Sequence, residues 1–441
     1  VWLMPDMSPI DPGATMRILF LSENFPPETN AAATRVHERA IYWVRAGHQV
    51  TVITQAPNFH FGRVYDGYRN RWRQVETIDG IRVVRVKTYI APNEGVIRRS
   101  LDFVSFMVTA VLAGLREERP NVVVSTSPQF FAAVAGWMIG ALRRVPFVFE
   151  LGDLWPASIA AVGAMRPGLA LRLVEKLELF LYRRAATVVA LTGAFKRNLV
   201  RRGISPKKIA VVINGVDIQR YGPRERDPAL AGEWNLKDRF TIGYVGTHGM
   251  AHGLENVIRA AAILGDEGPD GPVFVFAGPG AARDGLIAAA TEQGLQNVVF
   301  IPPQPKERMP AIWSLCDVAL VHLKDSPVFA GVIPSKIFEA MAMGLPILIA
   351  APPGEATQII EQEGAGMVVP AGDPGALADA VRQLASDETL RRALAAASHA
   401  AAPRYSRQFQ ADAMMEALKA AAAGDGGSAA DRVAALTEPG P

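Results

Sequence analysis

The stretch PSKIFEAMAMGLPI, residues 334–347, joins the start of a predicted helix to a buried strand. A proline before the first turn is compatible with helix entry, while Gly344 and Pro346 end the helix. The apolar run that follows, residues 347–350, predicts a strand. Helices that lead through tight turns into strands are the repeating units of an α/β fold.

The same stretch has features of a sugar-nucleotide site. The free N–H groups of Ser335 and Lys336, next to Pro334, would point at an anion such as a diphosphate. Glu339, one turn later, can accept hydrogen bonds from two vicinal hydroxyls of a ribose or hexose. The alternative is an ordinary joint between helix and strand with an exposed Glu339.

Helices and strands alternate on both sides of this segment. The first domain is predicted to begin with a βαβ unit, formed by a strand at 17–21, a loop, a helix at 31–46 and a strand at 49–54. Further strands are predicted at residues 81–86, 122–125, 147–150 and 187–191, and then at residues 241–245, 273–277, 298–301, 318–321 and 347–350. The pattern predicts two doubly wound, Rossmann-like domains.

The domain limits are predicted from residues that favour turns and linkers. We expect domains at residues 16–213 and 214–405, with a hinge near 214–223, where an Asn-Gly pair and a proline occur. Residues 1–15 are expected to be a flexible extension. Residues 423–441, rich in Gly, Ala and Asp, are expected to be a disordered tail.

Composition narrows the class of protein. The chain has 441 residues and is 49% hydrophobic, enough for two α/β domains with separate cores. Its net charge is only +3 and it lacks a basic tract interleaved with aromatics, so no nucleic-acid partner is expected. One cysteine, Cys316, excludes an internal disulfide, and residues 1–15 do not resemble a signal peptide. We therefore expect a cytoplasmic protein.

A candidate acceptor or phosphate loop follows the first strand. In NFPPETNAAATR, residues 24–35, small residues permit close approach of the backbone to a ligand, and Arg35 could meet a phosphate or carboxylate. Asn30, Ala32 and Arg35 are the candidate contacts. The alternative is a long, proline-stiffened connection with a solvated arginine.

Asp153 lies in FELGDLWP, residues 149–156, just past a buried strand and before a helix expected to start at Pro156. A carboxylate at this place can orient an acceptor hydroxyl or act as a base toward it. The alternative is a helix-capping aspartate.

Two glycine-rich turns follow strands of the second domain. Their backbone donors could cradle a phosphate. The predicted donor contacts in YVGTHGMAHGLE, residues 244–255, and in FAGPG, residues 276–280, are Gly246, Thr247, His248, His252 and Gly278. His248 and His252 also have the spacing of a metal pair, but the surrounding glycines disfavour a helix and no third ligand is evident, so no metal is expected.

The apolar segment 96–118 begins with Arg98 and Arg99. Such a segment could lie on an anionic membrane surface, with Phe103, Phe106, Met107 and Val108 on its apolar face. The alternative is a buried helix of the domain core.

Taken together, these strings resemble the retaining glycosyltransferases of family 4, most closely the WbuB-like branch that makes O-antigen, capsule and exopolysaccharide. The similarity runs from RILFLSENFPPETNAAATR through GDLWPAS, NGVD and PSKIFEAMAMGLPI to Tyr405-Ser406. It implies a GT-B fold, with two Rossmann-like domains facing across a deep cleft. The donor would bind the C-terminal half and the acceptor the N-terminal half, and a helix at 406–422 would cross back to the first domain.

The resemblance also implies residue roles. Glu339 would hold the donor ribose, the backbone of Ser335 and Lys336 its diphosphate, and Asp153 would lie near the reacting sugar. The chain departs from the family at three places: the usual first glutamate is Gly331, and the usual phosphate-binding Arg and Lys are Thr247 and His252. Lys336 and Arg35 are therefore expected to supply the compensating charge. We take Asp153, Lys336 and His252 as the catalytic candidates.

The implied activity is transfer of a hexose or N-acetylhexosamine, with retention, from a UDP-linked sugar to a polyprenyl-diphosphate-linked saccharide. The enzyme would act on the inner face of the cytoplasmic membrane as a peripheral protein, without a metal or another cofactor. Two alternatives are a UDP-sugar 2-epimerase of the same architecture and a catalytically silent glycosyltransferase-like subunit, since the glutamate and both cations are missing.

Overall fold

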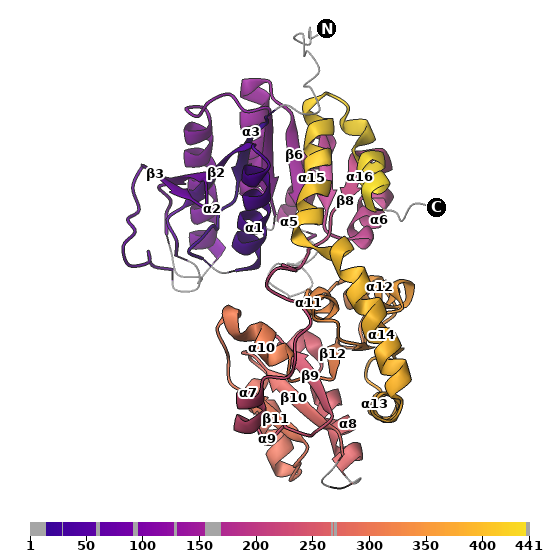
Figure 1. Cartoon of the computed structure of the whole chain (residues 1–441). Helices are drawn as coiled ribbons and strands as arrows, with labels where there is room; N and C mark the ends of the chain where they lie inside the picture. The colour runs from indigo at the N-terminus through magenta and orange to yellow at the C-terminus, as the bar shows by residue number, and fades with distance from the viewer. Residues whose placement is uncertain are drawn as a thin grey trace. The chain divides into compact units, whose positions relative to one another are not determined.

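The computed structural model describes residues 15–28, 30–58, 62–90, 96–127, 130–154, 169–265, 268 and 271–437. The chain forms two compact units, which we call unit 1 (Val1–Asn214 and Gln408–Pro441) and unit 2 (Gly215–Arg407) (Figure 1). The division falls within the Asn-Gly pair that marked the expected hinge. The expected N-terminal extension lies outside the described residues except for Thr15.

Unit 1 is built on an eight-stranded sheet with the order β3-β4-β2-β1-β5-β6-β7-β8. The strands are β1 (Arg17–Leu21), β2 (Gln49–Gln55), β3 (Arg73–Ile78), β4 (Ile81–Val86), β5 (Val122–Thr126), β6 (Phe147–Leu151), β7 (Thr187–Ala190) and β8 (Ile209–Val211). All neighbours are parallel except β3 and β4, which are joined by a turn with positive φ at Asp79 and Gly80. The predicted parallel sheet is confirmed, with an antiparallel strand added at one edge.

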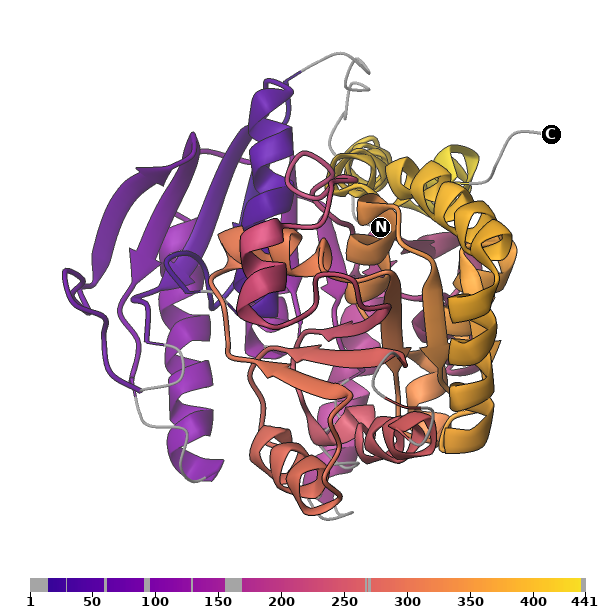
Figure 2. The same cartoon turned by 60° about the horizontal axis from the view of Figure 1, so that its bottom comes forward.

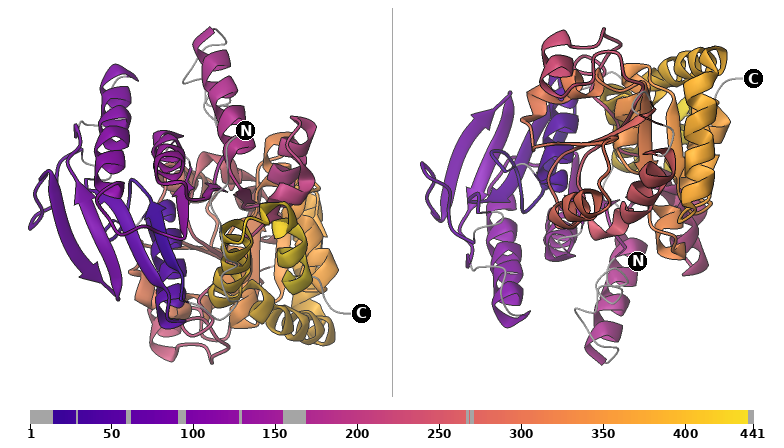
Figure 3. Two further views of the ribbon diagram at one scale, coloured as in Figure 1. Left: turned by 90° about the horizontal axis from the view of Figure 1, so that it is seen from above. Right: turned by 90° about the horizontal axis from the view of Figure 1, so that it is seen from below.

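Helices cover both faces of this sheet (Figure 3). One layer contains α1 (Ala31–Arg45), α15 (Arg407–Ala422) and α16 (Ala429–Thr437). The other contains α2 (Val96–Gly114), α3 (Phe130–Arg143), α5 (Leu169–Arg184) and α6 (Gly193–Arg201). The chain therefore returns to unit 1 through α15 after completing unit 2.

The expectation of a disordered tail is wrong for residues 423–437. A 3-10 turn, η6 (Gly426–Ser428), follows the glycine-rich joint and leads into α16. Ala429 and Val433 are 0% and 2% exposed in the unit 1 core. The glycines gave this segment a disordered composition, but the apolar residues after them bury a helix against the sheet. The last expected residues of the tail, 438–441, lie outside the described part of the chain.

Unit 2 has a six-stranded parallel sheet with the order β11-β10-β9-β12-β13-β14 (Figure 2). Its strands are β9 (Thr241–Val245), β10 (Val273–Ala277), β11 (Val298–Ile301), β12 (Val318–His322), β13 (Ile347–Ala350) and β14 (Gly366–Val369). Its helices are α7 (Pro228–Glu233), α8 (Glu255–Gly265), α9 (Arg283–Glu292), α10 (Met309–Trp313), α11 (Lys336–Met343), α12 (Glu355–Glu363), α13 (Pro374–Ser386) and α14 (Glu388–Ala401).

Each sheet has one point where the strand order reverses, between β1 and β5 in unit 1 and between β9 and β12 in unit 2. Open α/β sheets bind ligands outside the carboxyl ends of the strands at such points. Most of the predicted site residues follow these strands, whereas Asp153 and Gly278 follow the neighbouring strands β6 and β10. No helix in the described part of the chain is long and apolar enough to cross a bilayer.

Candidate active site

The start of α11 has the features expected of a diphosphate site. The hydrogen bonds of this turn begin with Ile337 N–H, which donates to Pro334 O over 3.1 Å. Among the described residues, the N–H groups of Ser335 and Lys336 have no acceptor. They lie at the positive end of the helix, where an anionic ligand is stabilised.

Lys336 brings a buried amine to the same place. Its side chain is only 8% exposed, and Nζ has no hydrogen-bond partner in the described part of the chain. Nζ lies 3.3 Å from the centroid of the Tyr244 ring, on β9. Burial lowers the pKa of Lys336 to about 7, although Glu339 acts in the opposite direction. A buried amine without a counter-ion would gain strongly from an anionic ligand.

Glu339 is held in place by Trp313. The indole Nε1–H donates to Oε2 of the carboxylate over 3.0 Å, and within the described chain no hydrogen bond reaches Oε1. Burial raises the pKa of Glu339, against the opposing effect of the Trp313 hydrogen bond. The fixed carboxylate therefore keeps one oxygen for a ligand, and the alternative of an exposed glutamate does not describe this residue.

The two glycine-rich turns touch each other beside Lys336. A Cβ atom at Gly278, whose φ is +138°, would lie 2.2 Å from Gly246 O. A Cβ at Gly246 would lie 3.2 Å from Nζ of Lys336. Thr247 is exposed at the tip, and the Tyr244 hydroxyl donates to its carbonyl over 2.9 Å. Glycine is needed at both turns because no side chain fits between them.

His248 is placed behind these turns. Its side chain is fully buried between the rings of Tyr244 and Phe276, at centroid distances of 5.7 and 5.9 Å. Its N–H donates to Pro279 O, and its carbonyl accepts from Ala282 N–H. Burial, with repulsion from Lys336, lowers the pKa of His248 to about 4. This placement argues against the predicted donor contact and indicates that His248 holds the two turns together.

His252 belongs to a histidine pair that sequence reasoning missed. It lies in the 3-10 turn η2 (Met250–His252), and its carbonyl is 2.6 Å from Nδ1 of His322 at the end of β12. Nδ1 of His252 is 3.3 Å from the His322 carbonyl, and Asn256 contacts Nε2 of His322. Burial, and then the nearby Lys336, lower the pKa of His252. Lys336 is thus surrounded by neutral histidines.

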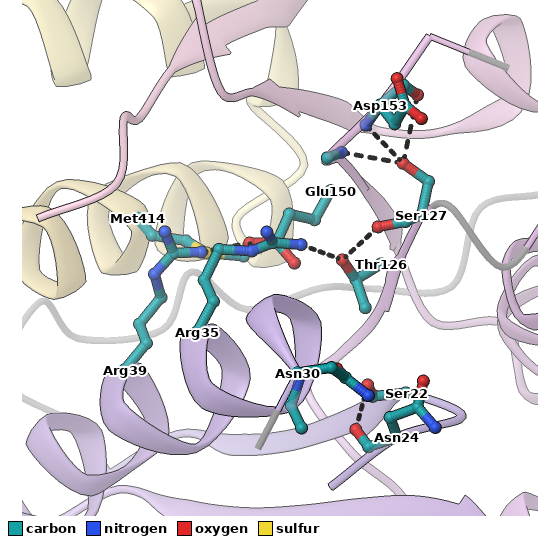
Figure 4. Close-up of polar contacts among 12 residues, drawn as sticks. Ser22, Asn24, Asn30, Arg35, Arg39, Thr126, Ser127, Glu150, Asp153 and Met414 are labelled. Atoms are coloured by element: carbon teal, nitrogen blue, oxygen red, sulfur yellow. Dashed lines mark hydrogen bonds and ion pairs between the residues drawn. The ribbon is translucent and has the colours of Figure 1, made fainter. Parts of the chain in front are cut away.

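In unit 1, the loop after β1 leads into the start of α1. Asn30 caps this helix, accepting from Ala33 N–H at 2.9 Å, and Ala32 lies in the first turn. Arg35 is not a solvated arginine. Its Nη2 donates to Thr126 Oγ1 over 3.0 Å, and its Nε lies 3.3 Å from Glu150 Oε1 (Figure 4). The alternative of a solvated arginine is therefore wrong.

Glu150, on β6, is shared between two arginines. Its side chain is fully buried, and it also pairs with Arg39, whose Nη1 lies 2.9 Å from Met414 Sδ on α15. Although burial raises the pKa of Glu150, Arg35 and Arg39 hold it below its ordinary value. Two guanidiniums facing one carboxylate leave a net charge of about +1, because arginine stays protonated.

Asp153 lies beside this cluster. The N–H groups of Gly152 and Asp153 donate to Ser127 Oγ over 2.8 and 3.2 Å (Figure 4). A Cβ at Gly152 would lie 2.8 Å from Arg35 Nη2, so glycine is needed for the arginine to approach this turn. The helix expected at Pro156, which Asp153 would cap in the alternative reading, lies outside the described residues.

Two family models match most of the chain. Residues 30–215 match the glycosyl transferase 4-like domain, and residues 229–400 match glycosyl transferases group 1. WcaI of Escherichia coli (strain K12), a glycosyl transferase named for colanic acid biosynthesis, is 26% identical over 75% of this chain and 82% of its own length. The D-inositol 3-phosphate glycosyltransferase of Nocardia farcinica (strain IFM 10152) is 30% identical over 67% of this chain and 66% of its own length.

Solved structures agree on the fold. HepE of Anabaena, in complex with UDP and glucose, has a TM-score of 0.66 at 19% identity, covering 91% of this chain and 99% of HepE. Sucrose-phosphate synthase of Thermosynechococcus elongatus has a TM-score of 0.68 at 17% identity, covering 90% and 97%. With its two matched domains and its GT-B fold, the chain belongs to glycosyltransferase family 4.

Proposed function

We propose that the protein is a retaining glycosyltransferase of surface-polysaccharide biosynthesis, within the WbuB-like branch. It transfers a hexose or N-acetylhexosamine from a UDP-linked sugar to a polyprenyl-diphosphate-linked saccharide, as a peripheral protein on the inner face of the cytoplasmic membrane. It requires neither a metal nor another cofactor. The colanic acid role in the name of WcaI and the UDP bound to HepE support the pathway and the nucleotide.

The start of α11 carries this proposal. It combines two free N–H groups, a buried amine without a counter-ion at Lys336, and a carboxylate fixed by Trp313 at Glu339. A nucleoside diphosphate offers a partner to each, because its phosphates accept from the N–H groups and the amine. Its ribose hydroxyls donate to the free Oε1 of Glu339. A neutral sugar alone would leave Lys336 unpaired.

The same groups account for the chemistry. As the bond from the sugar to the diphosphate breaks, negative charge grows on the leaving oxygen, where Lys336 and the helix terminus stabilise it. That oxygen takes the proton of the acceptor hydroxyl, and the new glycosidic bond forms on the same face of the sugar. Asp153 orients the hydroxyl, and Arg35 binds a phosphate of the acceptor. His252 stays neutral and supports the amine.

A lipid-linked acceptor fits the outer face of α2. The predicted apolar side chains Phe106 and Met107 pack inward, with Phe106 only 1% exposed in the unit 1 core. Phe103 stacks on Phe131. Val108 belongs instead to a row that faces outward at helical spacing: Leu101, Val104, Val108 and Leu112 on α2 and Leu115 just after it, each between 37% and 51% exposed. Arg98 is exposed at the amino end of this row, whereas the side chain of Arg99 lies outside the described part. We call this row the α2 stripe.

The first test replaces Glu339 with alanine. We expect UDP affinity to fall by about tenfold to a hundredfold, because ribose hydroxyls would lose their acceptor at a cost of about 1–3 kcal/mol. Calorimetry with UDP measures this, and Glu307→Ala at an exposed position is the control. Unchanged UDP affinity in Glu339→Ala would show that α11 is not part of the donor site.

Incubation with a panel of UDP-sugars and a lipid-linked acceptor separates the alternatives. Sugar transfer that survives chelation supports the proposal. Interconversion of UDP-sugars would indicate an epimerase, and UDP binding without turnover would indicate a silent subunit.

A further inference from the structure

A pocket lies at the amino-terminal edge of the unit 1 sheet, away from the residues assigned above. It encloses about 740 Å³ and includes Phe147, the first residue of β6. Asp153 follows the other end of the same strand. Because the strands around it are parallel, the pocket and the Asp153 turn lie at opposite edges of the sheet. This pocket therefore has no role in the proposed transfer reaction.

Segments far apart in the chain form its walls. They are the last turn of α3, the entry to β6, the turn between α5 and β7, the entry to β8, and the glycine-rich joint between α15 and α16. Apolar side chains make up much of the wall, including Trp137, Val145, Pro146 and Phe147. Three cations, Arg144, Arg184 and Lys208, complete it. Among the described residues that line the pocket, none is acidic.

The three cations are not neutralised by the protein. None of them forms an ion pair with a carboxylate in the described part of the chain. Lys208 Nζ donates to the carbonyl of Arg183 over 2.7 Å, and the Arg184 guanidinium lies 5.4 Å from the centroid of the Phe180 ring. Burial lowers the pKa of Lys208. These contacts fix the two side chains without cancelling their charge, and Arg144 and Arg184 are exposed to solvent, so an anion at the pocket would meet three cations that no carboxylate of the described residues neutralises.

The backbone at Arg144 is also unusual. Its φ is +53°, in the left-handed region that glycine or asparagine adopts more easily after a helix. The turn is closed by Val145 N–H, which donates to Gly140 O over 2.9 Å, as in helices that end on a left-handed residue. The arginine places a cation at the mouth of the pocket, directly after the end of α3.

We propose that this pocket binds the phosphate headgroup of an anionic phospholipid. The three cations would contact the phosphate, and the wall of Trp137, Pro146 and Phe147 would contact the apolar part of the lipid beneath it. The proposal rests on the membrane attachment proposed above and adds a headgroup site to it.

The position of exposed leucines favours a lipid over a soluble phosphate. Helices α2 and α3 each connect parallel strands, so both run from the carboxyl edge to the amino edge of the sheet. Leu112 and Leu115 of the α2 stripe and Leu142 of α3, which is 62% exposed, are therefore placed toward the same edge as the pocket. An apolar surface bordered by unpaired cations matches the chemistry of an anionic bilayer surface.

The glycine joint offers a blocking variant. Gly426 is required, because a Cβ there would lie 2.4 Å from Ala186 O, but a Cβ at Gly427 meets no atom within 4 Å. Gly427→Glu therefore adds a carboxylate to the wall without displacing a neighbour. The second variant is Arg144→Gln/Lys208→Gln. Its matched control is Arg183→Gln/Lys207→Gln, which removes the same charge from exposed neighbours that do not line the pocket.

The experiment is cosedimentation of the full chain with vesicles of phosphatidylcholine, alone or mixed with phosphatidylglycerol. We expect Gly427→Glu and Arg144→Gln/Lys208→Gln to bind the anionic vesicles at least about tenfold more weakly than wild type, since basic residues near such surfaces dominate attraction. The affinity of the control variant for anionic vesicles should stay within about twofold of wild type, because Arg183 and Lys207 do not line the pocket. UDP affinity should be unchanged in all of them.

Two results would overturn the proposal. One is an equal loss of vesicle binding in the control and the pocket variants, which would reduce the effect to overall charge. The other is binding of glycerol 3-phosphate to wild type in solution that Gly427→Glu abolishes while vesicle binding persists, which would assign the pocket to a soluble phosphate. Failure of the transferase proposal would be seen separately, as absent sugar transfer with vesicle binding intact.

Discussion

Lys336 gives the donor site a dependence on pH. Above its pKa of about 7 the buried amine is neutral in the free protein. A bound diphosphate stabilises the ammonium form, so the complex has a higher pKa and takes up a proton when UDP binds. The other groups facing the amine do not titrate above pH 7 in a compensating way. His248 has a pKa of about 4, and that of His252 is lowered.

We predict that UDP affinity is highest near pH 7 and falls by up to about tenfold for each pH unit above it, until Lys336 loses its proton in the complex as well. Calorimetry at constant ionic strength between pH 7 and pH 9 measures this slope. Lys336→Arg keeps its charge throughout and should give a flat profile. Uridine, which lacks phosphates, serves as the ligand control. An equally steep profile for Lys336→Arg would assign the proton to another group.

The Arg35–Glu150–Arg39 cluster allows a matched pair of variants. Arg35→Met and Arg39→Met each leave Glu150 with one guanidinium, so neither exposes an unpaired buried charge. Arg35 alone contacts the Thr126 side of the cluster, next to the Asp153 turn. We predict that Arg35→Met lowers kcat/KM for a diphosphate-linked acceptor by about tenfold to a hundredfold, the effect of a lost charged hydrogen bond of about 1.5–3 kcal/mol.

Arg39→Met should keep most of that activity, since Arg39 contacts Met414 rather than the ligand side. Acceptor kinetics at saturating UDP-sugar distinguish the two variants. Equal losses in both would show that the net charge of the cluster matters and that Arg35 makes no direct contact.

Local patterns predicted most strands because parallel strands buried on both faces form uninterrupted apolar runs. The expected strands at 17–21, 81–86, 241–245 and 273–277 coincide with β1, β4, β9 and β10. Sequence reasoning missed β3, an edge strand whose residues alternate between exposed and partly buried, and also the short strands β8 and β14.

The sequence predicted only those parts of the candidate site whose residues lie close together in the chain. Lys336 and Glu339 belong to one turn of one helix, so a single sequence segment predicted both site residues. Their partners come from elsewhere: Trp313 is 26 residues away from Glu339, and Tyr244 lies on another strand. Glu150 was overlooked because a carboxylate within the apolar run of β6 has no local signal. Only the packing of α1 against the sheet brings Arg35 and Arg39 to it.

The α2 stripe yields a prediction for one element. Its side chains lie outside the unit 1 core, so Leu101→Ser/Val108→Ser/Leu112→Ser should leave thermal stability nearly unchanged, as expected of surface substitutions. The variant should bind anionic vesicles more weakly and lose activity on a lipid-linked acceptor, while UDP affinity stays constant. Ile218→Ser/Leu436→Ser, at exposed apolar positions elsewhere, is the control. Retained vesicle binding in the triple variant would show that the α2 stripe does not bind the membrane.

The two units differ in how the chain builds them. Unit 2 is one continuous stretch, Gly215–Arg407, whereas unit 1 needs residues after Gln408 to cover its sheet. The core on that face includes the alanines and methionines of α15, among them Met414 and Ala417, both fully buried. The Trp43 indole also donates to the carbonyl of Ala411 on α15 over 2.9 Å. Unit 1 is therefore completed only after unit 2 has been made.

We predict that a chain ending at Arg407 loses the folded state of unit 1 but keeps that of unit 2. Removing α15 and α16 exposes one apolar face of the sheet around Trp43, and a typical domain is stabilised by only about 5–15 kcal/mol. The truncated chain should lose one of two thermal transitions in calorimetry and become more sensitive to protease in residues 15–214. Its affinity for UDP should persist, because Lys336, Glu339 and Trp313 all lie in unit 2. Two intact transitions would show that unit 1 folds without its C-terminal helices, and lost UDP binding would show that the donor site depends on unit 1.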